Sequence, residues 1–139
     1  MCGIVGLLLK KPALRSQLGE LMVPMLIGMT ERGPDSAGLA VFTDPLGSGL
    51  RKVSVYAGLT DEGADYNWTA LLDALNTELK IQAKASIKAN HAVITFEGSV
   101  EPVKAFIKAH SPKLHLLSAG RSIDLYKDIG TPAEVAARY

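Results

Sequence analysis

The sequence lacks several features that mark large classes of proteins. It has one cysteine in 139 residues, which excludes an intrachain disulfide and any multi-cysteine zinc or iron–sulfur site. Its net charge is only +1, with acids and bases interspersed, so nothing favours a nucleic acid or an anionic membrane as partner. The apolar run from Ile4 to Leu9 is far shorter than the ~20 residues of a membrane span. We therefore expect a cytoplasmic protein without membrane or nucleic-acid partners.

The overall composition is that of a folded domain. Hydrophobic residues make up 47% of the chain and charged residues 21%, close to the globular average. The length fits one domain of ordinary size or part of a larger one. The three histidines have no metal-ligand spacing within a recognisable motif, and no metal site is expected.

The first fifty residues predict a strand, a helix and a second strand. Residues 2–9 are short and apolar and end at a Lys-Lys-Pro breaker, which predicts a buried strand. Apolar residues then recur at helical spacing from Leu14 to Met29, with Pro24 either kinking this helix or starting another. A glycine-rich turn at 32–38 leads to a second buried strand over 39–42.

From Arg51 onward the pattern predicts the order β-α-β-β-α-β, the split βαβ or ferredoxin-like arrangement. The expected elements are a strand at 53–57, a helix at 68–79 capped by Asn67, strands at 85–89 and 92–96 around a turn at Asn90-His91, a helix capped by Ser99, and a strand at 114–117. Residues 121–129 favour one more strand. Thr131, Pro132 and Glu134 signal a helix start, so the chain is expected to stop about two turns into that helix.

Cys2 is the strongest candidate for chemistry. Initiator methionine is usually removed before a small residue, and removal would leave Cys2 with a free α-amine beside its thiol. Thiolate is the strong nucleophile, and an α-amine of pKa about 7.7–8.0 can accept its proton near neutrality. One residue would then carry both nucleophile and base. Gly3 would leave room for substrate or backbone to approach closely.

Two motifs together carry a family resemblance. The chain opens Met-Cys-Gly-Ile-Val-Gly, and Arg32 to Gly38 read Arg-Gly-Pro-Asp-Ser-Ala-Gly. In order and spacing these motifs resemble the class II, or N-terminal-nucleophile, glutamine amidotransferases over roughly the first 42 residues. The Pro34 variant and the long following insertion look most like the small subunits related to glutamate synthase, including the glutaminase subunit of N-methylglutamate synthase.

The resemblance implies an α+β protein with an N-terminal-nucleophile hydrolase αββα core. It implies glutamine hydrolysis to glutamate and ammonia through a thioester on Cys2, without a cofactor, and a partner synthase that accepts the ammonia. By matching position, Arg32, Gly33, Asp35 and Ser36 form the active-site or substrate-binding loop. Asp35 and Ser36 would shape this loop rather than react, and a salt-bridged turn made by Arg32 and Asp35 is an equal alternative to direct substrate contact. Gly33 and Gly38 would supply unusual backbone angles or close approach.

The family's later motifs are missing. The sequence has no Asn-Gly pair for an oxyanion hole and no His-Thr-Arg for glutamine binding. We therefore expect an incomplete core: residues 1–50 as the first part of the amidotransferase domain, 51–119 as the inserted ferredoxin-like βαββαβ subdomain, and 120–139 as a truncated return to the core. Two alternatives remain, a catalytically incomplete binding or regulatory module and an N-terminal-cysteine hydrolase of another amide. Such a chain is expected to expose strand edges and apolar surface, and so to aggregate or depend on a partner.

Overall fold

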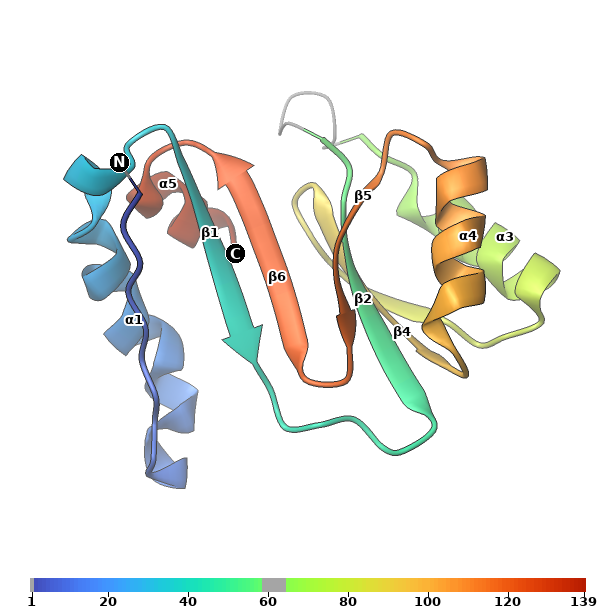
Figure 1. Cartoon of the computed structure of the whole chain (residues 1–139), viewed down its shortest axis with the longest axis horizontal. Helices are drawn as coiled ribbons and strands as arrows, with labels where there is room; N and C mark the ends of the chain where they lie inside the picture. The colour runs from blue at the N-terminus through green and yellow to red at the C-terminus, as the bar shows by residue number, and fades with distance from the viewer. Residues whose placement is uncertain (1, 59–64) are drawn as a thin grey trace. The chain divides into compact units, whose positions relative to one another are not determined.

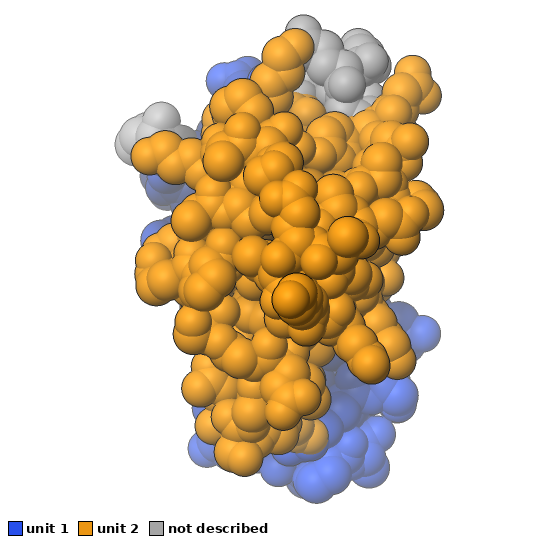
Figure 2. All heavy atoms as spheres, turned by 90° about the vertical axis from the view of Figure 1, so that its right-hand side faces the viewer, with its two compact units in different colours: residues 1–38, 127–139 blue, residues 39–126 orange. Residues whose placement is uncertain are grey.

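The structure, a computed structural model, describes residues 2–58 and 65–139 and is α+β (Figure 1). The chain divides into two compact units, unit 1 (Met1–Gly38 with Lys127–Tyr139) and unit 2 (Leu39–Tyr126) (Figure 2). Strands β1 (Ser36–Phe42) and β6 (Ile123–Ile129) form a two-stranded sheet, and each of these strands belongs partly to both units. The coarse fold class expected from the sequence is therefore confirmed.

Unit 2 contains a four-stranded antiparallel sheet. Its strands are β2 (Leu50–Tyr56), β3 (Lys84–Lys88), β4 (His91–Glu97) and β5 (His115–Gly120), in the spatial order β3-β4-β2-β5. Helices α3 (Trp68–Leu79) and α4 (Val100–His110) connect β2 to β3 and β4 to β5. The elements thus follow one another as β-α-β-β-α-β, the order that the alternating and helical patterns predict.

One face of this sheet packs against both helices and forms the main core. Because side chains alternate along a strand, Val53 and Val55 share a face with their partners Ile94 and Ala92. All four are fully buried. The helices add apolar side chains to the same cluster, among them Leu71, Leu75, Val103, Phe106 and Ile107. The hydrophobic driving force for folding is therefore concentrated in unit 2.

Local signals set the helix ends. Asn67 caps α3 by accepting a hydrogen bond from the backbone N–H of Ala70 at 3.0 Å, as its position predicts. The α3 helix ends in the left-handed residue Lys80, with φ 53°. Ser99 is the N-cap residue of α4, although its side chain makes no capping hydrogen bond. The turn expected at Asn90-His91 lies one residue earlier, because Ala89 adopts φ 47° and His91 is the first residue of β4.

The opposite face of the sheet in unit 2 is polar but also buried. Lys52 and Ser54 lie on this face, and both are almost completely inaccessible to solvent. Lys52 Nζ lies 2.7 Å from Asp124 Oδ1, and Ser54 Oγ accepts a hydrogen bond from the N–H of Leu125. The ring of Tyr126 lies 5.7 Å from that of buried His91. Polar contacts thus hold the first half of β6 against the sheet.

Unit 1 is mainly helical. It holds the 3₁₀ helices η1 (Pro12–Gln17) and η2 (Thr30–Arg32) and the helices α1 (Leu18–Ile27) and α5 (Pro132–Arg138), with α1 and α5 in contact. Pro24 lies inside α1, so the apolar stripe from Leu14 to Met29 becomes a 3₁₀ turn followed by one α-helix. Of the apolar side chains of α1 only Leu26 is buried, and several others are exposed, among them Leu21, Met25 and Ile27.

The strand predicted at residues 2–9 is wrong. These residues form no strand and run beside α1 (Figure 1). Nor is the segment buried, since Ile4 is 96% exposed and Leu8 is 80% exposed. A strand requires a hydrogen-bonded neighbour, and β1 and β6 pair only with each other among the described residues. The apolar sequence therefore produces an extended but unpaired segment.

Candidate functional site at the N-terminal end of unit 1

Gly3 brings the start of the chain against η2. A Cβ added at Gly3 would lie 2.9 Å from Cβ of Arg32 and 3.2 Å from Sδ of Met29. The first distance is shorter than real Cβ contacts, and Arg32 Cβ is fixed to the backbone, so no larger residue fits without a shift. The neighbouring Cys2 is exposed. The two sequence motifs are therefore joined by a direct contact between Gly3 and Arg32.

Successive tight turns shape the loop after α1. Thr30 Oγ1 donates a hydrogen bond to the carbonyl of Ile27 at 2.6 Å, and the N–H of Arg32 donates to the carbonyl of Met29 at 2.8 Å. The N–H of Gly33 then donates to the carbonyl of Thr30 at 3.1 Å. These bonds satisfy backbone groups at the helix end and fix the position of Arg32.

The turn before β1 is held to the turn between β6 and α5. The N–H of Gly130 donates a hydrogen bond to the carbonyl of Asp35 at 3.0 Å. Gly130 has φ +128°, a conformation that favours glycine. The N-terminal residues, the loop after α1 and the start of α5 thus lie at one end of unit 1 (Figure 1).

Most of the sequence-predicted site residues lie on the surface of the protein. Arg32, Asp35 and Ser36 are exposed, and Ser36 is the first residue of β1. Cys2, Arg32 and this turn thus belong to the same unit, and the side chains of Cys2, Arg32, Asp35 and Ser36 reach its surface.

The expectation for the loop glycines is not met at Gly33. Its φ of −167° is ordinary extended backbone, and an added Cβ would come no closer than 3.9 Å to the carbonyl of Ser36. Gly38 does not adopt a positive φ either. A close approach does occur at Gly3, where an added Cβ would lie 2.9 Å from Cβ of Arg32.

Sequence reasoning missed a polar cluster on β6 and α5. The buried carboxylate of Asp128 accepts hydrogen bonds from Arg138 Nη1 and Tyr139 Oη, both at 2.9 Å, and from the N–H of Ile129. These contacts anchor α5 to β6. No signal in the sequence identifies them, since Asp128 and Arg138 are separated by a turn and most of a short helix.

A capping box fixes the start of α5. Glu134 accepts hydrogen bonds from the N–H and the hydroxyl of Thr131, while Thr131 Oγ1 accepts one from the N–H of Glu134. The hydrogen bond from the Thr131 backbone, followed by that from its side chain, lowers the pKa of the Glu134 carboxyl. The Thr-Pro-x-Glu pattern predicts this helix start correctly.

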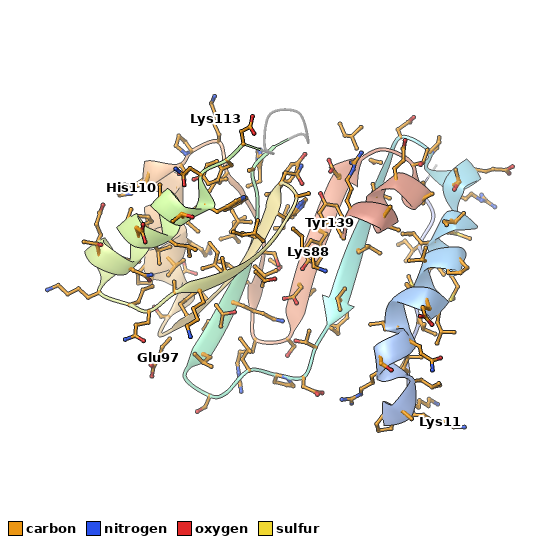
Figure 3. The ribbon with its side chains drawn as sticks, turned by 180° about the vertical axis from the view of Figure 1, so that it is seen from behind. Lys11, Lys88, Glu97, His110, Lys113 and Tyr139 are labelled. Atoms are coloured by element: carbon orange, nitrogen blue, oxygen red, sulfur yellow. The ribbon has the colours of Figure 1, made fainter. Side chains whose placement is uncertain are left out.

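The remaining candidates belong to unit 2 and have structural partners. His91 is buried, and its Nδ1 lies 2.8 Å from Asn90 Oδ1. His110 (Figure 3) stacks on Phe106 and pairs with Glu78 at 3.2 Å. The described residues contain no cluster of His, Cys, Asp and Glu able to hold a metal. Nor do they include a helix long and apolar enough to cross a membrane.

Comparison with known proteins identifies two relatives that are named as glutamine amidotransferases or as similar to them. The chain is 39% identical to the Glutamine amidotransferase-like protein GlxB of Rhizobium meliloti (strain 1021), over all of this chain and 44% of that protein. It is 29% identical to a Putative glutamine amidotransferase of Methanothermobacter thermautotrophicus, over all of this chain and 47% of that protein. No family model and no solved structure matches. The chain spans less than half the length of these curated relatives, and the likenesses support an amidotransferase family.

Proposed function

We propose that this chain carries the nucleophile of a class II glutamine amidotransferase, with Cys2 as the residue that attacks glutamine. The observation that carries the proposal is the contact of Gly3 with Arg32, which joins the opening motif to the Arg-Gly-Pro-Asp-Ser turn. The likeness of this chain, over its whole length, to less than half of two proteins named glutamine amidotransferase-like and putative glutamine amidotransferase supports the same substrate. Arg32, whose guanidinium can bind a carboxylate with two hydrogen bonds, is the residue we assign to substrate orientation.

In the proposed reaction, Cys2 and water supply the atoms that form and break bonds with glutamine. With Met1 removed, the α-amine takes the thiol proton, and the thiolate Sγ forms a bond to the side-chain carbonyl carbon of glutamine. Collapse of the resulting oxyanion breaks the C–N bond, and nitrogen leaves as ammonia with the proton from the amine. Water, deprotonated by the same amine, then attacks the thioester. Cleavage of the C–S bond releases glutamate and regenerates the thiol.

The architecture that we propose follows from the family. Unit 1 with the two-stranded sheet would be part of an N-terminal-nucleophile αββα core, divided as residues 1–50 and 120–139. Residues 51–119 would be an inserted ferredoxin-like subdomain, and the sheet order β3-β4-β2-β5 supports this assignment. We assign the chain to the glutamate-synthase-related branch, in which a partner synthase accepts the ammonia. No cofactor is part of the proposal.

The test is covalent labelling by 6-diazo-5-oxo-L-norleucine, a glutamine analogue that loses N₂ when a thiolate alkylates. Intact mass spectrometry of the unlabelled chain first establishes that Met1 has been removed. A single adduct mapped to Cys2, prevented by excess glutamine and absent from Cys2→Ser, is the expected result. The processed chain must show cooperative thermal unfolding, so that a missing adduct reports on the site. A folded, processed chain that gains no adduct would refute a competent glutamine site.

The alternative is a binding or regulatory module that retains the loop but cannot hydrolyse glutamine. The missing Asn-Gly and His-Thr-Arg sequences favour it, since loss of one oxyanion donor costs about 10²–10³ in rate. This module would bind glutamine without alkylation of Cys2. Isothermal titration with glutamine, run on the same folded sample as the labelling, separates the two functions.

A further inference from the structure

The two edge strands of the sheet in unit 2 differ in how they are protected. In the order β3-β4-β2-β5, both β3 and β5 have one side that no other described strand pairs with. Strand β3 carries Lys84 and Lys88, and charged side chains on an edge discourage pairing with another chain. Strand β5, with the sequence His-Leu-Leu-Ser-Ala-Gly, has no lysine, arginine or acidic residue. Its backbone therefore lacks this protection.

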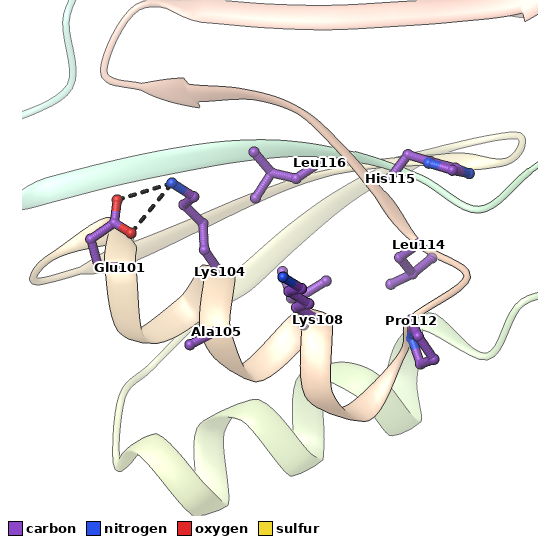
Figure 4. A pocket seen from close by; sticks show the side chains of 9 residues that line it. Glu101, Lys104, Ala105, Lys108, Pro112, Leu114, His115 and Leu116 are labelled. Atoms are coloured by element: carbon purple, nitrogen blue, oxygen red, sulfur yellow. Dashed lines mark hydrogen bonds and ion pairs between the residues drawn. The ribbon is translucent and has the colours of Figure 1, made fainter.

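A cavity of about 450 Å³ lies between β5 and α4 (Figure 4). Leu116 lies on β5 and Leu114 immediately precedes this strand, while Ala105 and Ile107 lie on α4. Ile107 and Leu114 are buried, whereas Ala105 is exposed. An unprotected edge beside an apolar cavity is the arrangement in which an extended peptide adds a strand and inserts alternate side chains.

The charges around this cavity are mainly positive. Lys104 and Lys108, which both line the cavity, lie one turn apart on α4. The one acid in the lining is Glu101, which contacts Lys104 at 3.0 and 3.3 Å (Figure 4). Glu101 therefore offsets Lys104, and the formal charge of the lining remains positive through Lys108. Complementary charge favours a partner segment with acidic side chains.

We propose that the β5 edge and the α4–β5 cavity form a docking groove for an extended, acidic segment of a partner protein. The segment would add to β5 as a short strand, place apolar side chains against Leu114 and Leu116, and direct carboxylates toward Lys104 and Lys108. Backbone hydrogen bonds would supply affinity, and the cavity and lysines would supply selectivity. The proposal does not depend on the chemistry of Cys2, which lies in unit 1.

Two features disfavour a second copy of this chain as the occupant. Pairing β5 with its own copy would bring two positively charged grooves together, and like charges across an interface oppose association. The pairing of β5 with β2 also contains a bulge, since Ser118 and Leu116 oppose neighbouring residues of β2 and Leu117 has no partner there. A bulge bends an edge and shortens the stretch that can pair. A short peptide suits such an edge better than another sheet.

The test uses the full chain and a fluorescein-labelled hexapeptide amide in which glutamate and valine alternate. Fluorescence anisotropy at physiological and raised salt measures its affinity. Reversing both groove lysines, Lys104→Glu with Lys108→Glu, is expected to weaken binding about tenfold, since each exposed charge contributes a few-fold. Ala105→Trp, which fills the cavity from its exposed side, is expected to abolish binding. The matched control, Lys84→Glu on the opposite edge strand, should change affinity less than twofold.

A second measurement identifies the mode of binding. Amide hydrogen exchange followed by NMR should slow for residues 115–120 when the peptide is added, because β5 gains backbone partners. A matched hexapeptide with lysine in place of glutamate should bind at least tenfold more weakly. The proposal is overturned if neither peptide binds at millimolar concentration, or if binding leaves exchange in β5 unchanged. A dimer in sedimentation that the peptide cannot dissociate would assign the groove to a second copy instead.

Discussion

The buried ion pair between Lys52 and Asp124 gives a prediction that does not depend on function. Lys52 is 4% exposed, and its Nζ lies 2.7 Å from Asp124 Oδ1 and 2.8 Å from Thr43 Oγ1, to which it donates a hydrogen bond. The Asp124 side chain is 18% exposed. Within the described residues Asp124 Oδ1 accepts no hydrogen bond of good geometry, so its contact with Lys52 is ionic rather than directional. Replacing Asp124 by leucine would leave a buried ammonium with only a hydroxyl partner.

The expected cost of Asp124→Leu follows from the loss of charge compensation. Removing one member of a buried pair typically costs about 3–5 kcal/mol, because the remaining charge is uncompensated. Partial exposure of Asp124 favours the lower end, about 3 kcal/mol. For a chain of this size that corresponds to a fall in melting temperature of about 6–12 °C. The double variant Lys52→Met with Asp124→Leu should lie within about 1 kcal/mol of the parent, since it leaves no charge unpaired.

The assay is urea denaturation of the parent, both single variants and the double variant, followed by circular dichroism. The exposed pair of Lys104 and Glu101 supplies the control, and Glu101→Gln should cost no more than about 0.5 kcal/mol. These four proteins form a double-mutant cycle. Its coupling energy separates the interaction of Lys52 with Asp124 from the packing that each side chain contributes by itself. If Asp124→Leu costs no more than Glu101→Gln, the pair is solvated in solution and the packing of β6 on the sheet is wrong.

Two further predictions concern unit 1. Gly3→Ala should slow alkylation of Cys2 by about 10- to 100-fold, because the new Cβ would collide with η2 and displace the nucleophile, whereas Gly6→Ala has open space and should label at the parent rate. Glu134 has a pKa lowered from its ordinary 4.5 by hydrogen bonds from Thr131, so its contribution to stability is present above that value and is lost as pH falls through the lowered pKa. In the Glu134→Gln variant the melting temperature should therefore fall less steeply as the pH is lowered. If the variant and the parent lose melting temperature equally in acid, the capping box is contradicted.

The element order of unit 2 could be predicted because each element carries its own periodic signal. Val53 and Val55 alternate with polar neighbours, Leu71 and Leu75 recur at helical spacing, and Asn67 supplies a cap. Element ends were less predictable. Strand β1 begins at Ser36 rather than residue 39, and β5 continues to Gly120 rather than ending at residue 117. Strand ends depend on how far the neighbouring strand extends, which local sequence does not encode.

The polar interior of unit 2 could not be predicted for a related reason. A lysine that alternates with apolar strand residues normally indicates a solvent-facing side, and Lys52, followed by Val53, Ser54 and Val55, has this pattern. Its burial depends on Asp124, which is distant in sequence and belongs to a strand of the other sheet. Asp128 and Arg138 pair across the turn between β6 and α5 in the same way. Charges that compensate each other through tertiary structure have no local signature.

The N-terminal segment shows that an alternating apolar sequence can predict an extended chain without predicting that the chain pairs as a strand. Val5, Leu7 and Leu9 are half-buried while Ile4 and Leu8 are exposed, so the alternation expected of an extended chain is present. Pairing is not, because it requires a neighbouring strand as well as a suitable sequence. The position of Cys2 is consequently set by the contact of Gly3 with η2 rather than by a sheet. Since the contact of Gly3 with η2 lies directly beside the nucleophile in the chain, the reactivity of Cys2 should respond more strongly to substitution of Gly3 than the overall stability of the chain does.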